Sequence, residues 1–284
     1  MRVVRINGVQ YRGASAPARP TLDAQAGAGL IETMRACDGQ IVHRALHLER
    51  LASSLRALGI DGAPDAGAIA CELDAALEGC VAADAVVRLV VSARPACVVE
   101  VAPVEPLDAT PPMFSALTLP GGWVPGEAAA EHKRTERDHW VRAECAAAAV
   151  GADIVLTTDL SGRLGEASRA SVFVVADGVL WTAPARGLLP GIGRRVMMQI
   201  AGDVIVQAAE RALWQRADEV FVVSALRGVA AIVTVDSAPV GNGTAGPVTR
   251  RLAARYRACV LGGDRAGSPG VDDGRLDGAG IPVA

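Results

Sequence analysis

The sequence is almost without lysine. Lys133 is the only lysine among 28 basic residues, and all the others are arginine. A primary amine can lose its proton when it is desolvated and can form a Schiff base with a carbonyl, whereas a guanidinium stays charged above a pH of about 12. The single lysine therefore suggests a reactive amine, although an arginine-rich composition can also leave one surface lysine by chance.

Other absences narrow the class of protein. No apolar run reaches the length of about 18 residues needed to span a bilayer, and no basic patch accompanies the net charge of −3. We therefore expect neither a membrane nor a nucleic acid as partner. The 6 cysteines are scattered without C-x-x-C spacing, and no signal-peptide pattern is present. We expect reduced core thiols in a cytoplasmic protein, and no metal site.

Strand and helix patterns occur in both halves of the chain. Residues 3–7 and 30–35 predict strands that end at turns, and apolar residues at helical spacing predict a helix over 47–58. The other elements that we expect are helices at 68–77, 136–150, from 194, 207–214 and 248–260, and strands at 86–91, 98–101, 154–157, 172–175, 179–181, 219–223 and 232–235. This mixture predicts an α/β (α+β) fold.

The chain divides near residues 103–125, where prolines and glycines cluster. With 51% hydrophobic residues, each half can bury a core. The predicted division is a small N-terminal α/β domain at 1–103, an interdomain linker at 104–125, a larger mixed α/β domain at 126–261 and a disordered tail at 262–284.

Three further features can carry chemistry. A turn containing Gly191 and Gly193 opens a predicted helix, and backbone N–H groups at a helix N-terminus suit a phosphate. Glu166 lies in a predicted hairpin, and Arg50 lies on the first long helix. Taken singly, these features are most simply a structural turn, a hairpin carboxylate and a solvated arginine.

The order of these features along the chain is more informative than any one of them alone. Together with Lys133, the segments that matter are residues 29–35, 47–51, 132–133, 165–166, 171–173, 189–192 and 224–228. In this order and spacing they resemble the fold-type IV, or class IV, pyridoxal-phosphate enzymes. That superfamily includes branched-chain and D-amino-acid aminotransferases and aminodeoxychorismate lyases. The resemblance covers residues 1 to about 260 and implies a two-domain fold, pyridoxal 5'-phosphate as cofactor and a homodimer.

The resemblance also implies roles for individual residues. Lys133 would form the Schiff base with the cofactor and move the substrate's Cα proton. Glu166 would pair with the pyridine nitrogen, and a protonated ring is the better electron sink. Arg50 would bind the phosphate. The other cofactor-binding positions that the resemblance implies are Gly191, Ile192, Gly193, Ser224 and Ala225.

Three positions depart from the family pattern. Gly193 stands where threonine is common, Ser171 where asparagine is usual, and Trp140 where tyrosine is frequent. Gly193 offers only its N–H, so one hydrogen bond to the phosphate would be missing, and Trp140 lacks the phenol that would donate to the cofactor's ring oxygen. These departures put cofactor affinity in question more than they do the fold.

The resemblance leaves the reaction open. An aminotransferase needs a cation for the substrate carboxylate, and Arg35 and Arg88 are candidates, although each can equally be a structural arginine. An aminodeoxychorismate lyase would eliminate pyruvate to give 4-aminobenzoate, and Arg227 would join these two arginines in binding its carboxylates. A third reading is a cofactor-poor relative that binds a metabolite. We expect the aminotransferase first, acting on an amino acid and a 2-oxo acid.

Overall fold

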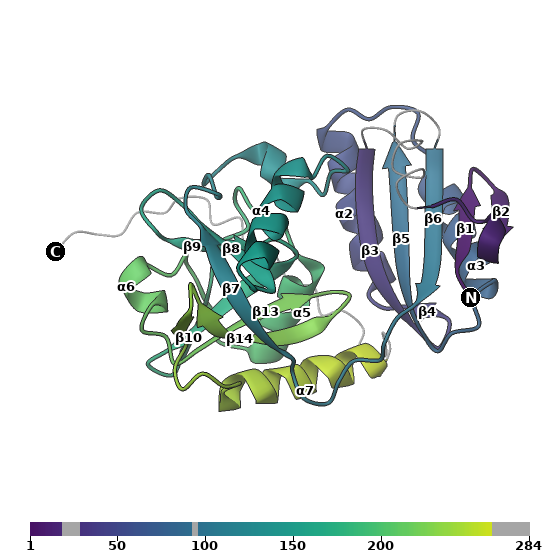
Figure 1. Ribbon diagram of the computed structural model, residues 1–284. Helices are drawn as coiled ribbons and strands as arrows, with labels where there is room; N and C mark the ends of the chain where they lie inside the picture. The colour runs from purple at the N-terminus through teal and green to yellow at the C-terminus, as the bar shows by residue number, and fades with distance from the viewer. Residues whose placement is uncertain (19–28, 93–95, 263–284) are drawn as a thin grey trace.

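Two β-sheets with helices packed against them make up the protein (Figure 1). The computed structural model describes residues 1–18, 29–92 and 96–262. The predicted mixture of helices and strands is confirmed. Gly262 closes the last helix, and the rest of the predicted tail lies outside the described residues.

The N-terminal half forms a six-stranded antiparallel sheet. Its order is β2-β1-β6-β5-β3-β4. The strands are β1 (Val3–Ile6), β2 (Val9–Arg12), β3 (Gly29–Cys37), β4 (Gln40–Ile41), β5 (Asp84–Ser92) and β6 (Ala96–Pro103). The predicted turn between β1 and β2 has Asn7 and Gly8 at φ values of 47° and 87°. Left-handed residues at both positions match the twist of a tight hairpin.

Helices α2 (Arg44–Ala57) and α3 (Ala66–Glu78) pack on one face of this sheet. Side chains alternate along β3, so Leu30 and Met34 enter the core under these helices. Ile31 and Thr33, by contrast, line a cavity on the opposite face. The sequence of β3 therefore presents one apolar face to the helices and one face to the rest of the molecule.

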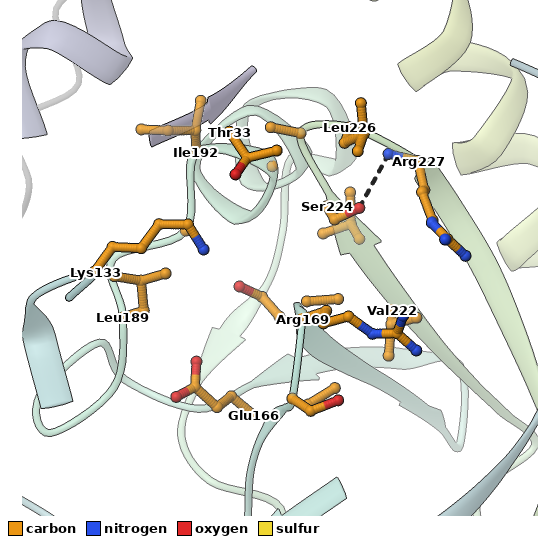
Figure 2. A pocket seen from close by; sticks show the side chains of 18 of the residues that line it. Thr33, Lys133, Glu166, Arg169, Leu189, Ile192, Val222, Ser224, Leu226 and Arg227 are labelled. Carbon is orange, nitrogen blue, oxygen red and sulfur yellow. Dashed lines mark hydrogen bonds between the residues drawn. The ribbon is translucent and has the colours of Figure 1, made fainter. Parts of the chain in front are cut away.

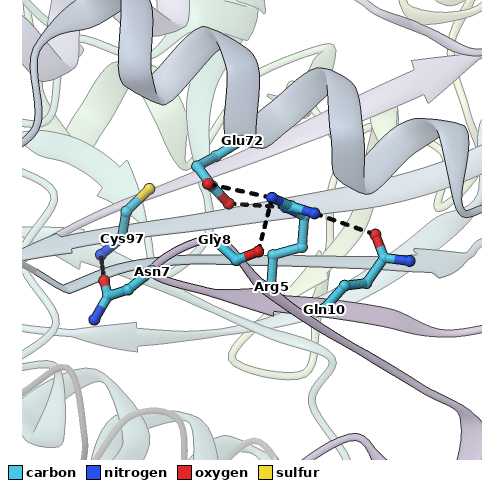
Figure 3. Close-up of polar contacts among 6 residues, drawn as sticks. All are labelled: Arg5, Asn7, Gly8, Gln10, Glu72 and Cys97. Atoms are coloured by element: carbon cyan, nitrogen blue, oxygen red, sulfur yellow. Dashed lines mark hydrogen bonds and ion pairs between the residues drawn. The ribbon is translucent and has the colours of Figure 1, made fainter.

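An ion pair ties the first strand to α3. Arg5 donates from Nε and Nη2 to Glu72 at 2.8 and 3.3 Å (Figure 3). The same guanidinium donates from Nη2 to the carbonyl of Gly8 at 3.1 Å. Asn7 Oδ1 accepts the backbone N–H of Cys97 at 2.8 Å. These contacts hold the β1–β2 hairpin against α3 and β6.

The C-terminal half contains a nine-stranded sheet. Its strands are β7 (Met113–Leu119), β8 (Ile154–Thr158), β9 (Leu164–Ala167), β10 (Ala170–Ala176), β11 (Val179–Thr182), β12 (Ile205–Val206), β13 (Glu219–Ser224), β14 (Gly228–Val235) and β15 (Ala238–Pro239). Strand β9 pairs with both β8 and β10. The path β10-β13-β14-β7-β8-β9 therefore closes on itself as a ring of strands.

Helices surround this ring. They are α4 (Asp138–Ala149), α5 (Ile192–Ala201), α6 (Arg211–Trp214) and α7 (Pro247–Leu261). Two 3-10 turns occur elsewhere in the chain: η1 (Gly13–Ser15) follows β2, and η2 (Ala128–Glu131) precedes α4. Helices α5 and α7 cover a core in which Phe173 and Phe221 stack at 5.1 Å. Within the described residues, none of the helices combines the length and apolar content of a membrane span.

Two sequence predictions need correction. The predicted linker at 104–125 contains β7, which pairs in parallel with β14 and β8 and so belongs to the nine-stranded sheet. The helix predicted over 207–214 is only the four-residue α6. The carbonyl of Ala209 accepts the N–H of Leu164 at 3.0 Å, so the backbone before Arg211 is committed to β9 and is not helical.

Candidate active site

A cavity of about 500 Å³ is lined by residues from both sheets. The six-stranded sheet contributes Thr33 to its wall, and the ring of strands contributes Glu166 and Val222 (Figure 2). The predicted site residues that line the cavity are Arg50, Arg88, Lys133, Glu166, Gly191, Ile192, Gly193, Ser224, Ala225 and Arg227. Residues that are far apart in the chain thus converge on one space.

The segment that carries Lys133 is attached to the edge of β3. Ile31 N–H donates to the Lys133 carbonyl at 2.8 Å, and Thr135 N–H donates to the Gly29 carbonyl at 2.9 Å. The Thr135 hydroxyl accepts the N–H of Gly29 at 2.9 Å. These bonds fix an otherwise irregular segment, and Figure 2 shows the lysine side chain extending into the cavity.

The amine of Lys133 is easier to deprotonate than that of an ordinary lysine. Burial lowers its pKa most, and the charges of Arg137 and Arg50 lower it further, against Glu32 and Glu166, to about 8. A lysine with this pKa offers a neutral, nucleophilic amine at mildly alkaline pH. The reactivity inferred from the single lysine thus has a physical cause in the site.

Glu166 faces the same space from β9. Its Cα is paired with that of Ser171 on β10, and both residues line the cavity. Burial raises the pKa of Glu166 to about 7, although Lys133, Arg137 and a hydrogen bond from the Leu189 backbone act in the opposite direction. A carboxylate in this state can hold or release a proton near neutral pH.

Arg50 is fixed by a buried carboxylate that the sequence reasoning missed. Its Nε and Nη2 donate to Glu32 at 2.8 and 2.5 Å, and its Nη1 donates to the Pro190 carbonyl at 3.0 Å. Of the five N–H groups of a guanidinium, one on Nη1 and one on Nη2 are left after these bonds. These two N–H groups remain able to donate to a phosphate.

Glu32 also contacts His47, whose Nδ1 lies 2.7 Å from its carboxylate. Burial alone would raise the pKa of Glu32, but Arg50 and His47 hold it at about 2. Burial also lowers the pKa of His47. Neutral His47 on α2 therefore donates from Nδ1 to ionised Glu32 on β3, and Glu32 in turn holds Arg50 in place.

The glycine turn lies where side chains do not fit. A Cβ on Gly191 would come within 2.5 Å of Ser171 Oγ. A Cβ on Gly193 would lie 3.1 and 3.2 Å from backbone atoms of Ser224. The start of α5 thus packs closely against the Ser224 backbone, and a larger residue at Gly193 would need its neighbours to shift by a few tenths of an ångström.

Arg227 lies on the turn that follows Ser224. Its backbone N–H donates to Ser224 Oγ at 3.1 Å (Figure 2). Its side chain is exposed, and among the described residues it makes no hydrogen bond or ion pair. A guanidinium in this state can bind an anion that enters the cavity. Arg88 reaches the cavity from β5 on the opposite wall.

Arg35 is a correction to the predicted site. It is 2% exposed and is not among the residues that line the cavity. Its guanidinium forms an ion pair with Asp84 and donates to the carbonyls of Leu226 and Glu105 at 2.9 Å each. Arg35 therefore connects the N-terminal sheet to the turn that carries Arg227, and we withdraw it as a ligand for the substrate carboxylate.

This role predicts a stability defect. Arg35→Gln should lower the free energy of unfolding by about 3 kcal/mol, because it leaves a mostly buried Asp84 without its charge partner. Arg44→Gln is the matched control, since Arg44 pairs with Asp74 on the surface and should cost less than about 1 kcal/mol. Urea unfolding of both variants measures the difference, and equal losses would contradict the role assigned to Arg35.

Arg137 is a second residue that the sequence reasoning missed. It lines the cavity, and its Nη2 donates to the Ser168 carbonyl at 2.9 Å. The only signal in the sequence is its position four residues after Lys133. Trp140, which stands where tyrosine is frequent, also lines the cavity.

Comparison with known proteins identifies the family. The family model described as amino-transferase class IV matches residues 29–235. The chain therefore belongs to the class IV aminotransferase family, whose members depend on pyridoxal phosphate. The branched-chain-amino-acid aminotransferase of Escherichia coli (strain K12) is 33% identical over 102 residues, which are 34% of this chain and 33% of that protein. The match thus spans about a third of the length of this curated relative.

Solved structures show the same fold over most of the chain. A hypothetical aminotransferase from Mycobacterium tuberculosis in its apo form has a TM-score of 0.80 at 22% identity, covering 93% of this chain and 100% of that one. Its PLP-bound form has a TM-score of 0.78. A putative 4-amino-4-deoxychorismate lyase from Legionella pneumophila has a TM-score of 0.69 at 20% identity, covering 79% of this chain and 88% of that one.

The donor set of the cavity fits the family's cofactor. Arg50 and the glycine turn at the start of α5 can hold a phosphate, Lys133 offers an amine, and Glu166 offers a carboxylate. Gly191, Ile192 and Gly193 line the cavity at the start of α5, where no side chain caps the helix, so the N–H groups of its first turn can donate to an anion. The departures at Gly193, Ser171 and Trp140 change individual donors and leave this set in place.

Proposed function

We propose that this protein is a pyridoxal-phosphate-dependent aminotransferase that moves an amino group between an amino acid and a 2-oxo acid. The observation that carries the proposal is the meeting of Lys133 and Glu166 in one cavity with a phosphate-binding corner at Arg50. Each of the three belongs to a different part of the chain. A metabolite-binding protein without cofactor has no need of all three together.

Each residue has a defined task in this proposal. The cofactor, when bound, supplies an electron-withdrawing ring that stabilises the negative charge left on the substrate's Cα. Lys133 would hold the cofactor covalently, and its Nζ would accept and return the Cα proton. Glu166 would keep the ring nitrogen protonated. Arg50, the backbone at Gly191, Ile192 and Gly193, and Ser224 and Ala225 would hold the phosphate.

Substrate carboxylates have two candidate partners. Arg88 approaches the cavity from β5, and Arg227 approaches it from the turn before β14. A guanidinium binds a carboxylate with two parallel hydrogen bonds, which orients the substrate as well as attracting it. We propose that these two arginines select the carboxylates of the amino acid and the oxo acid.

The same pair of arginines supports a second candidate function. Aminodeoxychorismate carries two carboxylates, and a lyase of the folate pathway that converts it to 4-aminobenzoate and pyruvate would use both cations. The fold is compatible with this reaction, because the Legionella pneumophila protein titled as such a lyase is a structural neighbour. We place the aminotransferase first because the curated relative with 33% identity is an aminotransferase.

A single-turnover assay separates the two reactions. With an amino donor alone, an aminotransferase should yield one equivalent of oxo acid per site and should become catalytic only when a 2-oxo acid is added. A panel of L- and D-amino acids identifies the donor and its stereochemistry. Catalytic pyruvate and 4-aminobenzoate from aminodeoxychorismate, with no acceptor present, would replace the aminotransferase by the lyase.

We further propose that the enzyme acts in the cytoplasm as a homodimer on small molecules. Support for the dimer comes from the family resemblance.

A further inference from the structure

The surroundings of Lys133 carry more positive than negative charge. Four charged residues act on its amine directly: Arg50 from α2, Glu32 from β3, Glu166 from β9 and Arg137 from the residue before α4. The other ionisable side chains that line the cavity are His132 beside the lysine, Arg88 on β5, Arg169 between β9 and β10, and Arg227 before β14. Among the described residues that line the cavity, Glu166 is the only carboxylate.

Two of the arginines that line the cavity are each paired with a neighbouring carboxylate. Arg50 is paired with Glu32 at 2.5 Å, so these two charges largely cancel at a distance. Arg169 is paired with Glu144 at 3.1 Å and is 46% exposed, so water screens what remains. Neither side chain therefore presents its full charge to the cavity.

Arg137 differs from both. In the part of the chain that the structure describes, no carboxylate forms an ion pair with it. Its Nη2 donates to the carbonyl of Ser168 at 2.9 Å, which fixes the guanidinium without neutralising it. Ser168 comes two residues after Glu166, so Arg137 bridges the lysine segment and the strand that carries the carboxylate.

We propose that Arg137 is a positioning residue whose charge, held in the cavity by the Ser168 carbonyl and not by an ion pair, favours the neutral form of the Lys133 amine. A guanidinium is always charged, so its influence does not vary over the working range of pH. In a partly buried cavity, like charges repel far more strongly than they do in water. An ammonium on Lys133 therefore costs more free energy with Arg137 present.

The pattern of pKa values agrees with this assignment. After burial, Arg137 is the largest cause that lowers the pKa of Lys133, ahead of the paired Arg50. Burial lowers the pKa of Arg137 itself, while Glu166 and Glu144 act to raise it. Arg137 thus acts on Lys133 and is itself influenced by Glu144 and Glu166.

The role deepens the proposed function and rests on it, because a neutral amine is the form that bonds to the cofactor and accepts the Cα proton. The neutral fraction grows as the pH rises through the pKa of Lys133. Removing the Arg137 charge should therefore displace the pH profile of cofactor attachment to higher pH. It should not abolish attachment at high pH.

The single lysine makes a direct test possible. The full chain, produced with ¹³C-labelled lysine and freed of cofactor, gives one Cε resonance, and its titration reports the pKa of Lys133 without substrate or turnover. We expect a midpoint near 8 for the wild type. In Arg137→Gln we expect the midpoint to rise by about one, as loss of a nearby like charge requires.

Arg169→Gln is the matched control, since it removes a second cavity-lining arginine whose charge is already paired. Its midpoint should stay within about 0.3 of the wild type. Arg137→Met, which keeps most of the aliphatic stem, repeats the test if glutamine disturbs the fold. An unchanged midpoint in a folded Arg137 variant, or an equal rise in Arg169→Gln, overturns the proposal. A protein that shows the expected titrations but transfers no amino group would contradict the proposed function alone.

Discussion

Lys133→Arg should abolish amino transfer, with a loss of at least about a thousandfold. A guanidinium stays protonated at every working pH, so it can neither bond to the cofactor's aldehyde nor accept the Cα proton. The steady-state rate of oxo acid formation with saturating cofactor measures the effect. Thermal unfolding of the variant shows whether the fold is intact, as we expect for a side chain that faces a cavity.

Arg134 allows a control that tests whether the lysine must stand at position 133. It is exposed, and its one ion-pair partner among the described residues is the exposed Glu136. The double variant Lys133→Arg/Arg134→Lys restores one lysine to the chain, one residue away from the cavity-lining position. We expect it to remain inactive, and recovery of near-normal activity in either variant would remove Lys133 from the centre of the mechanism.

Glu166→Gln should slow the reaction about a hundredfold, which corresponds to about 3 kcal/mol in the barrier. A neutral amide no longer favours a protonated ring, so the ring accepts the Cα charge less well. Cofactor binding should largely persist, because the phosphate contacts at Arg50 are untouched. Exchange of the substrate Cα hydrogen with solvent deuterium measures the affected step directly.

Glu136→Gln is the control for Glu166, because Glu136 is an exposed carboxylate close to Lys133 in the chain but outside the cavity lining. It should leave the exchange rate unchanged. If the Glu166→Gln exchange rate equals that of the wild type, another group must partner the ring nitrogen.

Local patterns in the sequence predicted most of the fold. The alternation along β3 and the leucine spacing of α2 are short-range signals, and both elements form with nearly the expected bounds. β7 was missed because prolines and glycines flank a strand whose partners, β8 and β14, lie far along the chain. The helix at α6 was predicted too long for a similar reason, since a long-range hydrogen bond at Ala209 overrides helical propensity.

In the candidate site, too, features set by the local sequence were predicted and features set by long-range contacts were not. Lys133, Glu166 and Arg50 were predicted because their residue types and order resemble a family, and the structure places all three at one cavity. Arg35 was misassigned because its neighbours, Asp84 and the carbonyl of Leu226, are brought to it only by folding. Glu32 acts through His47 and Arg50, and Arg137 acts through the carbonyl of Ser168, partners that are distant in the sequence and meet only on folding. The spacing of residues in the sequence does not predict such contacts.

The most direct test of the central claim is reduction of the protein with borohydride in the presence of pyridoxal 5'-phosphate, followed by peptide mapping with mass spectrometry. Lys133 carries the only side-chain primary amine in the chain, so the α-amine of Met1 is the one competing amine. We predict one cofactor per chain, on the peptide that contains Lys133, together with loss of activity. Cofactor that is bound but never fixed to Lys133, or a label found on Met1 alone, would contradict the account.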